Sequence, residues 1–335
     1  MYLRMTSKIL INGNDAGKTS SVDINSSWEN LTDTAVFMSK NNFVINNENI
    51  TEKIKKGDKV EIYLGYGDSL MLRFKGYVRK ISIEAPYKIE CEDEMFRLKR
   101  FIIRGYSEQS VTLQKLIDDM LEEAGINDIN TIVSDANLGD FQIDRVSIAD
   151  VLRELRDKYS LNVFFRDCIL YAGLPFSLVD GDNYSYVFDG NKASIINDNL
   201  EWQDVDDSDI VINAKSENME TNEKIEIFVY YNSSREIVVS DSEIQGSIRT
   251  YNDVNRTRDE LVDIAKRRLQ RNDYTGFSGS FTTFGHKNIK VGDVVNLTSY
   301  KYRDRKNGSY YIKSINDSFT KQGYRMTVYL DRIAG

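Results

Sequence analysis

The first hundred residues alternate between apolar and polar positions, a pattern typical of β-strands with one buried face. Segments such as KILIN, SVDIN, TAVFMS and KVEIYL follow it between residues 8 and 100, separated by clusters of Asn, Gly and Asp. Alternating segments return from about Tyr184 to the end of the chain. Short strands at this spacing favour sandwiches or small barrels. We therefore expect two β regions and a mainly β (α+β) fold.

Between the two β regions the apolar residues recur at helical spacing. VTLQKLIDDMLEEAG has one apolar face and stops at Gly125, and SIADVLRELRDKY opens with a capping pair, Ser147 and Asp150. LNVFF and CILYAGL then predict a hairpin whose turn is Arg166 and Asp167. A small α/β module is expected here.

A third helix is predicted inside the second β region, from 257 to 271. Thr257 and Glu260 form a capping box at its start. Its apolar stripe consists of Leu261, Ile264, Ala265 and Leu269. We expect this helix to lie outside the second barrel and to cover its sheet with the stripe.

One short motif occurs twice, since Ile-Lys-x-Gly-Asp-x-Val begins at Ile54 and again at Ile289. Each copy is followed by a similar strand, YVRKISI in the first case and YIKSIND in the second. A single Gly-Asp turn is common, because Gly accepts unusual backbone angles and Asp bonds its own backbone. Two copies with the same downstream order indicate a duplicated barrel. The turn residues are Gly57, Asp58, Gly292 and Asp293, and the apolar residues that follow them are Val60, Ile62, Val295 and Leu297.

These patterns divide the 335 residues into three units. We expect a first barrel at 1–105, the α/β module at 106–176, and a second barrel at 177–335 that carries the helix 257–271. A chain of this length can bury more than one core.

Composition removes several classes of function. The net charge of −8, from 44 basic and 52 acidic residues, argues against tight nucleic-acid binding, which needs clustered cations. Cys91 and Cys168 are too few for a disulfide framework and have no ligand-spaced His or Cys beside them, so no metal is expected. The sequence contains no apolar run of about 20 residues, so the chain is not expected to insert into a membrane by itself.

Three features resemble active sites but have simpler interpretations. GNDAGKT, 13–19, has three residues between its glycines where a phosphate-binding loop has four, and a strand follows it, so we expect a turn. His286 is the only histidine and is expected in an exposed loop. The acidic run EWQDVDDSDI, 201–210, is interpreted as a solvated loop, although paired carboxylates can hydrolyse glycosides and Trp202 could stack on a sugar. We expect no catalytic residue, no cofactor and no enzyme activity.

The C-terminal stretches YTGFSGSFTTFGHKNIKVGDVVNLTS and NGSYYIKSINDSFTKQGYRMTVYLDR, with the helix before them, resemble the closing region of the phage late control protein D and baseplate (tail) hub family. That family includes the hub part of type VI secretion spike proteins. SVDINSSWENLTDTAVFMS and FKGYVRKISIEAPYKIECED resemble the family's opening strands. The matching positions are Gly285, Gly292, Asp293, Gly308, Tyr310, Gly323 and Tyr324, while Val291 replaces the usual Pro before Gly-Asp.

The resemblance implies a structural virion protein of a phage, prophage or other contractile injection system. It implies a homotrimer in which each chain supplies two tube-type β-barrels, so that a ring of pseudo-sixfold symmetry joins a threefold spike to the sixfold tail tube and lines its channel. The implied partners are the tail tube protein, a separate spike or needle protein, and baseplate wedge proteins. Synthesis in the bacterial host cytoplasm, assembly into the tail or baseplate and a neutral to acidic channel wall are expected.

Two other functions remain open at this point. The chain could be the hub portion of a tail-associated cell-wall hydrolase, or an unrelated carbohydrate-binding β-barrel protein in which the duplication repeats a binding site. The mass in solution and activity on peptidoglycan separate these possibilities.

Overall fold

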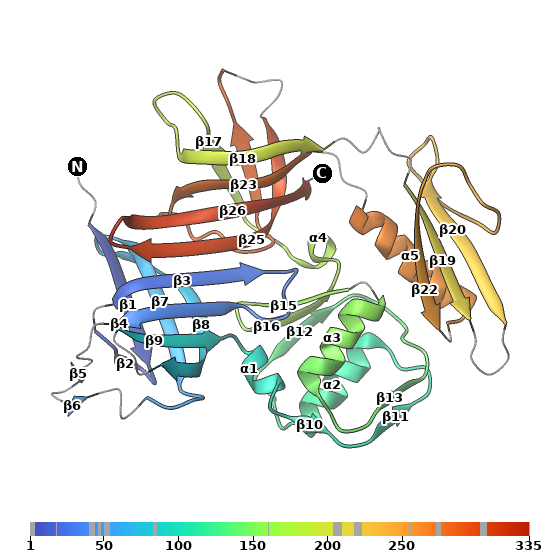
Figure 1. The fold of residues 1–335 in the computed structure, drawn as a ribbon, viewed down its shortest axis with the longest axis horizontal. Helices are drawn as coiled ribbons and strands as arrows, with labels where there is room; N and C mark the ends of the chain where they lie inside the picture. Colours follow the sequence, from blue (N-terminus) through green and yellow to red (C-terminus); the bar gives the residue numbers. More distant parts are fainter. Residues whose placement is uncertain are drawn as a thin grey trace.

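The computed structural model describes residues 4–17, 19–39, 44–45, 48–49, 54–82, 86–159, 161–203, 210–217, 223–254, 256–272, 276–301 and 307–334. Its largest feature is a continuous 13-stranded sheet built from both ends of the chain, with the middle of the chain arranged beside it (Figure 1). The mainly β fold expected from the alternating pattern is confirmed.

The N-terminal half of this sheet is antiparallel, in the order β3-β4-β9-β8-β7-β1-β2. Alternation in the sequence becomes alternation of burial, as in β4, where every second side chain is buried. The strands are β1 (Met5–Ile11), β2 (Asn14–Asp15), β3 (Thr19–Ser27), β4 (Thr34–Ser39), β7 (Lys59–Tyr66), β8 (Ser69–Ser82) and β9 (Tyr87–Glu92). A separate two-stranded ribbon is formed by β5 (Val44–Ile45) and β6 (Glu48–Asn49).

The C-terminal half has the strand order β18-β23-β26-β25, with β24 paired to β25 and β17 paired to β24. The strands are β17 (Asn183–Val187), β18 (Ile195–Gln203), β23 (Gly276–Phe284), β24 (Val294–Thr298), β25 (Gly308–Thr320) and β26 (Gly323–Ile333). The order β3-β4-β9-β8-β7 of the first half therefore has a counterpart in β18-β23-β26-β25-β24. The sixth strands differ, because β1 runs antiparallel to β7 while β17 runs parallel to β24.

The two halves meet where β25 pairs with β3. Residues 308–311 of β25 pair with β24, and residues 314–319 pair with β3, so one long strand serves both halves. Side chains from both halves form one apolar core, which includes the fully buried Phe37 of β4 and Phe281 of β23. Because this core is continuous and close-packed, the two halves are expected to move together as one rigid unit.

The α/β module lies below the joint in Figure 1. Its elements are α1 (Met95–Leu98), β10 (Ile102–Ile103), β11 (Tyr106–Glu108), α2 (Leu113–Glu123), β12 (Asn130–Val133), β13 (Phe141–Ile143), β14 (Val146–Ser147), α3 (Ile148–Tyr159), β15 (Asn162–Arg166), β16 (Ile169–Gly173) and α4 (Pro175–Leu178). The hairpin of β15 and β16 turns at Asp167 and Cys168, one residue later than predicted, because these two residues adopt the left-handed angles that the tight turn requires.

A fourth unit, absent from the sequence-based division, follows β18. It is a four-stranded sheet of order β21-β20-β19-β22, formed by β19 (Ile210–Glu217), β20 (Lys224–Tyr231), β21 (Ile237–Ser240) and β22 (Ser247–Val254), with α5 (Arg258–Asn272) against it. Figure 1 shows this unit at the right, apart from the barrels.

The expectation that this helix covers the second barrel is therefore wrong. Leu261, Ala265 and Leu269 pack on Ile212, Ala214, Ile227 and Val229 of β19 and β20, while Ile264 joins the core of the α/β module. An apolar stripe shows that a helix must be covered but does not show by which surface. Among the residues that the structure describes, no helix is long and apolar enough to cross a membrane.

Candidate functional site

The first Gly-Asp turn leads into β7. Gly57 has a positive φ of 96°, and its N–H donates to the carbonyl of Val78 at 2.8 Å. The N–H of Val78 donates in return to the carbonyl of Asp58 at 2.9 Å, and the N–H of Lys55 donates to Asp58 Oδ2 at 2.6 Å. Glycine suits the bend because L residues with side chains rarely adopt this angle.

The second Gly-Asp turn repeats these bonds at the entry to β24. Gly292 has a φ of 89° and donates to the carbonyl of Ile312 at 2.8 Å. Ile312 donates back to the carbonyl of Asp293 at 2.8 Å, and the N–H of Lys290 donates to Asp293 Oδ2 at 2.7 Å. Three equivalent hydrogen bonds therefore close both turns.

The apolar residues after each turn enter the same core. Val60 is opposite Gly76 and Val295 is opposite Tyr310, at matching places on β8 and β25. Ile62, Leu64 and Leu297 follow on the buried face. A one-residue slip in either copy would reverse the face of every side chain, so the shared register is a demanding coincidence for unrelated strands.

Irregularities in the sheet also occur at matching places. The pairing of β8 with β9 shifts between Val78 and Lys80, and that of β25 with β26 shifts between Ile312 and Ser314. In the same way the pairing of β3 with β4 shifts after Thr19, and that of β18 with β23 shifts after Ile195. Bulges are specific features of a fold rather than random defects. The two halves thus share strand order and two bulges. Two further shifts, in β7–β8 after Ile62 and in β25–β26 after Tyr310, occur in one half only.

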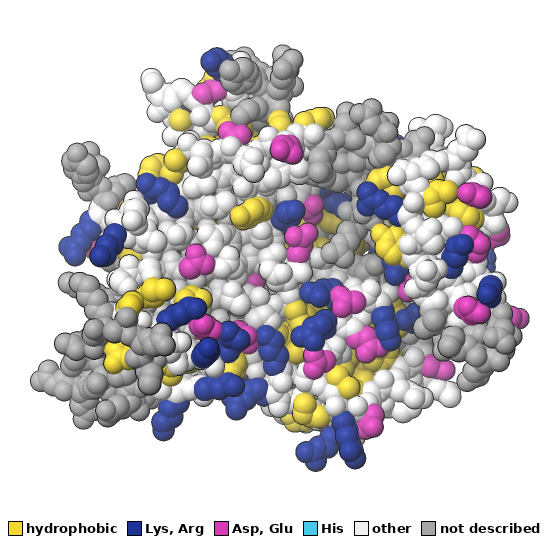
Figure 2. Space-filling model, viewed as in Figure 1, with side chains coloured by type: hydrophobic (Ala, Val, Ile, Leu, Met, Phe, Trp, Pro, Cys, Tyr) yellow, Lys and Arg dark blue, Asp and Glu magenta, His cyan; other side chains and the backbone are white. Residues whose placement is uncertain are grey.

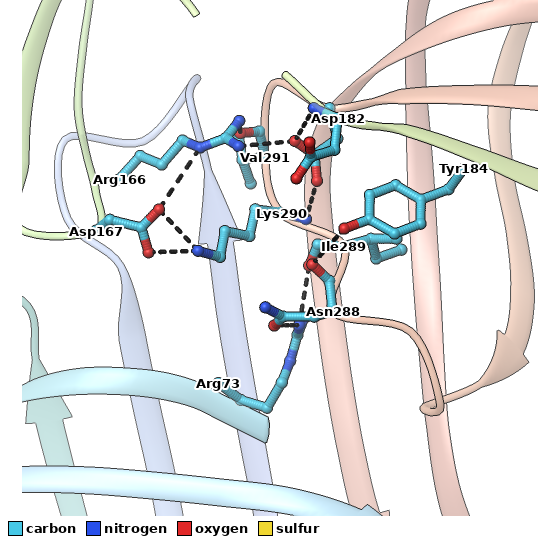
Figure 3. Close-up of polar contacts among 10 residues, drawn as sticks. Arg73, Arg166, Asp167, Asp182, Tyr184, Asn288, Ile289, Lys290 and Val291 are labelled. Atoms are coloured by element: carbon cyan, nitrogen blue, oxygen red, sulfur yellow. Dashed lines mark hydrogen bonds and ion pairs between the residues drawn. The ribbon is translucent and has the colours of Figure 1, made fainter. Parts of the chain in front are cut away.

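The surroundings of the second turn differ from those of the first. Arg166, at the end of β15, donates from Nη2 to Asp293 Oδ1 at 2.7 Å and from Nη1 to the carbonyl of Val291 at 2.7 Å. The N–H of Asp182 donates to the same Oδ1 at 3.1 Å. Figure 3 shows these groups converging on the turn, and Asp293 is only 1% exposed. The α/β module is therefore fastened to the second half at this turn.

Two more side chains tie the module and the first half to the same loop (Figure 3). Lys290 Nζ forms an ion pair with Asp167 at 2.7 Å. Arg73 of β8 donates from Nη1 to the carbonyl of Ile289 at 2.9 Å. The loop before β24 thus touches both the module and the opposite half of the sheet.

Arg73 also belongs to a buried network across the joint. Its Nη2 pairs with Asp317 Oδ2 of β25 at 3.0 Å, and Tyr324 Oη donates to Asp317 Oδ1 at 2.7 Å. Burial, together with the charge of Asp317, raises the pKa of Tyr324, which keeps this hydroxyl protonated as a donor. The Arg73–Asp317 ion pair is buried, and its other hydrogen-bonding atoms also have partners. Such a pair fixes the geometry of the joint.

A cavity of about 310 Å³ lies between the joint and the module. Arg73, Arg166 and Lys290 line it, each already paired with a carboxylate, together with Asp33, Asp93 and Cys168. Burial raises the pKa of Asp33 to about 7, and burial and the neighbouring Asp33 raise the pKa of Asp93. All three cationic side chains are therefore neutralised by carboxylates of this chain. We interpret the cavity as part of the packing between the module and the sheet, and not as a binding site.

The structure places the sequence features that resemble active sites on different elements. His286 is exposed, and its ring Nδ1 lies 3.0 Å from the carbonyl oxygen of Phe284. Across the described ranges, no three His, Cys, Asp or Glu side chains are grouped so that they could hold a metal ion. Part of the acidic run, 204–209, lies outside the described residues, and Trp202 packs edge-on against Phe277. Within GNDAGKT, residues 14–15 form β2, and Thr19 begins β3.

Sequence patterns did not identify Arg73, Arg166, Asp182 or Asp317 as parts of this site. Arg166 stood only in a predicted hairpin, and the other three lie in or beside strands. Arg73 bonds Asp317 across 244 positions, and Arg166 and Asp182 bond Asp293 across 127 and 111 positions, so no local spacing could reveal these contacts.

No family model and no curated protein sequence matches the chain. Solved structures do match. The tail protein from Neisseria meningitidis superposes with a TM-score of 0.66 and 13% identity, covering 98% of this chain and 96% of that one. The 43 kDa tail protein of prophage MuSo2 from Shewanella oneidensis gives a TM-score of 0.65 and 16% identity, covering 98% of both chains.

A third structure comes from the type VI secretion system of E. coli. It is a component described as similar to the bacteriophage T4 tail proteins gp27 and gp5, and it gives a TM-score of 0.58 and 11% identity over 98% of this chain and 77% of that one. These identities are low, and the likeness concerns the fold. The resemblance drawn from the sequence is confirmed at that level: this chain has the fold of phage tail proteins and of a related type VI secretion component.

Proposed function

We propose that this chain is a non-enzymatic hub of a phage tail or related injection baseplate, in which three copies form a ring of six similar barrels. One observation carries the proposal: the two halves of a single sheet share strand order, the register after each Gly-Asp turn and two bulges, and are joined edge to edge by β25 and β3. A threefold ring of such chains offers six similar surfaces. A sixfold tail tube on one side and a threefold spike on the other are the partners that this symmetry fits.

The exposed face of the continuous sheet suits the wall of a channel. Asn316 Nδ2 donates to Asn25 Oδ1 at 2.9 Å across the joint, and the hydroxyls of Thr282 and Thr327 are 3.3 Å apart. Figure 2 shows that the middle of this face carries few Lys or Arg side chains. Nucleic acid slides past such a surface, because tight phosphate binding requires clustered cations.

Light scattering on the purified chain tests the proposal. We expect a species of three times the chain mass of 38.6 kDa, with threefold particles in electron micrographs. A stable monomer, or a closed ring of another order, would contradict it. Zymography on peptidoglycan and binding to cell-wall glycans are expected to be negative, and a positive result in either assay would favour the hydrolase or the carbohydrate-binding alternative.

A further inference from the structure

A groove of about 460 Å³ lies beside the first Gly-Asp turn, between β8 and the α/β module. It borders α1, which connects the first half of the sheet to the module (Figure 1). The ring of Phe96 in α1 stacks on Tyr77 of β8, with the ring centroids 5.6 Å apart. Phe101, Ala124 and Ile126 continue the apolar surface on the side of the module. The volume is within the range of pockets that hold small ligands.

The groove also carries two cations that the chain does not neutralise. Arg97 is shared by two carboxylates, those of Glu94 at 3.1 Å and Asp128 at 2.7 Å. Lys59 and Arg100 line the groove as well and are exposed. Their side chains form no ion pair with any residue that the structure describes. A carboxylate that pairs with them must therefore come from another molecule or from outside the described residues.

Arg100 has a counterpart at the second turn. A methyl group added to Gly57 would lie 3.6 Å from Arg100 Nη1, and one added to Gly292 would lie 3.1 Å from Arg166 Nη1. The guanidinium of Arg166 pairs with Asp293, and its side chain is only 12% exposed. The first half therefore presents an exposed arginine at a place where the second half uses one to bind a carboxylate.

The surroundings of Arg100 favour a ligand that is both apolar and acidic. Its guanidinium carbon lies 5.2 Å from the centroid of the Phe96 ring, which holds the cation beside the apolar surface. Lys55 and Lys56 are exposed just before the turn, so the potential around the groove is positive. A nucleic acid needs a row of cations along its phosphates, whereas an acidic peptide can use a few cations around an apolar surface.

We propose that this groove binds an acidic segment of another protein, which packs an apolar side chain against Phe96 and Ile126 and pairs its carboxylates with Lys59 and Arg100. A charge-assisted contact beside a buried apolar anchor gives the segment both orientation and selectivity. The site goes beyond the proposed hub function, and it is complete within one chain. Val179 covers the corresponding place at the second turn, so a ring of three chains would carry three such sites.

A selection of random peptides displayed on filamentous phage tests this proposal. The library is first depleted on the double variant Lys59→Gln, Arg100→Gln and then selected on the unmodified full chain. We expect the enriched peptides to contain an aromatic or branched apolar residue flanked by Asp or Glu. In fluorescence anisotropy, each single variant should bind these peptides about five-fold more weakly, the size expected for partly exposed ion pairs. Added salt should weaken binding to the unmodified chain.

Two controls separate the groove from general charge effects. The double variant Lys192→Gln, Lys321→Gln also removes two exposed cations, but from the loops before β18 and β26, so it should bind the peptides as the unmodified chain does. Ala124 is partly exposed at the C-terminal end of α2 and lines the groove. Ala124→Glu should abolish peptide binding by occupying the groove with a carboxylate, and it should leave the circular dichroism spectrum and the melting temperature unchanged.

Each outcome decides for or against the site. Acidic peptides that lose binding in the groove variants and keep it in the Lys192→Gln, Lys321→Gln control support the proposal. A selection that enriches no acidic peptide, or peptides that bind equally well to Ala124→Glu, would overturn it. Binding of single-stranded DNA that depends on Lys59 and Arg100 would assign these cations to nucleic acid instead. None of these results changes the mass in solution, so the hub proposal is tested separately.

Discussion

The turn at Gly57 and the turn at Gly292 use the same hydrogen bonds, but Asp58 is partly exposed whereas Asp293 is 1% exposed beneath Arg166 and the N–H of Asp182. The backbone of both turns follows from Gly, Asp and the returning strand. Residues of the α/β module lie near both turns, with Phe96 and Arg100 beside Gly57, but only Asp293 accepts a guanidinium from the module. Two copies of a local structure can therefore contribute very different amounts to stability.

The largest loss of stability is expected at the equivalent buried valines that follow the two turns. Val60 and Val295 are both fully buried, so Val60→Asp and Val295→Asp should each destabilise the chain by about 4 kcal/mol or more, because an unpaired carboxylate would be placed in an apolar core. Urea unfolding followed by circular dichroism measures both. If one variant were nearly neutral, the two positions would not be equivalent.

The next effect should separate the turns. Asp293→Ala leaves the buried guanidinium of Arg166 and two N–H groups without their acceptor, at a cost of about 3–5 kcal/mol. Asp58→Ala loses one bond from Lys55 in a partly exposed turn, at a cost of about 1 kcal/mol. Equal unfolding midpoints for the two variants would show that the module does not stabilise the second turn.

Alanine at the glycines should give a smaller difference of the same sign. Both positions have positive φ, which costs a residue with a side chain about 1–2 kcal/mol. At Gly57 the added methyl would be 3.6 Å from Arg100 Nη1, an ordinary contact, but at Gly292 it would be 2.7 Å from Val179 Cγ1. Gly292→Ala should therefore cost about 1–3 kcal/mol more. Thermal unfolding of the two variants compares them directly.

The last difference concerns pH and belongs to the first half. At the places of Asp33 and Asp93, the second half has Phe277 and Arg332. Because folding raises the pKa of Asp33 from its ordinary 3.8 to about 7, the folded state binds the proton more tightly. The protonated Asp33 carboxyl therefore contributes its full stabilisation below about pH 4, and this stabilisation is lost as the pH rises through about 7.

Urea midpoints of the wild type and Asp33→Asn between pH 5 and pH 8 test this. The wild type should lose stability relative to the variant as the pH increases, because only the wild type must ionise this group. Parallel curves would mean that the pair does not titrate in this range.

Much of the fold could be predicted from the sequence, and the limits are physical. Alternation placed β4, β7 and β26, the helical period with the stop at Gly125 placed α2, and a capping pair placed α3, because these signals lie within a few residues of one another. The small domain of β19–β22 was merged with the second barrel, since its strands alternate like those on either side. The side on which α5 is covered could not be predicted from its own stripe.

The sequence by itself determined that two Gly-Asp turns exist, that each is followed by a buried strand, and that the chain is a mainly β protein. Turn residues and apolar periodicity depend only on residues that are close together in the sequence, so both can be recognised from the sequence alone. Only the tertiary structure decided that β25 closes the edge of β3, that Arg166 buries Asp293 and not Asp58, and that β18 and the end of β8 remain open. Strand edges pair through backbone groups that nearly every residue carries, so the partner of an edge is determined by how the whole sheet folds.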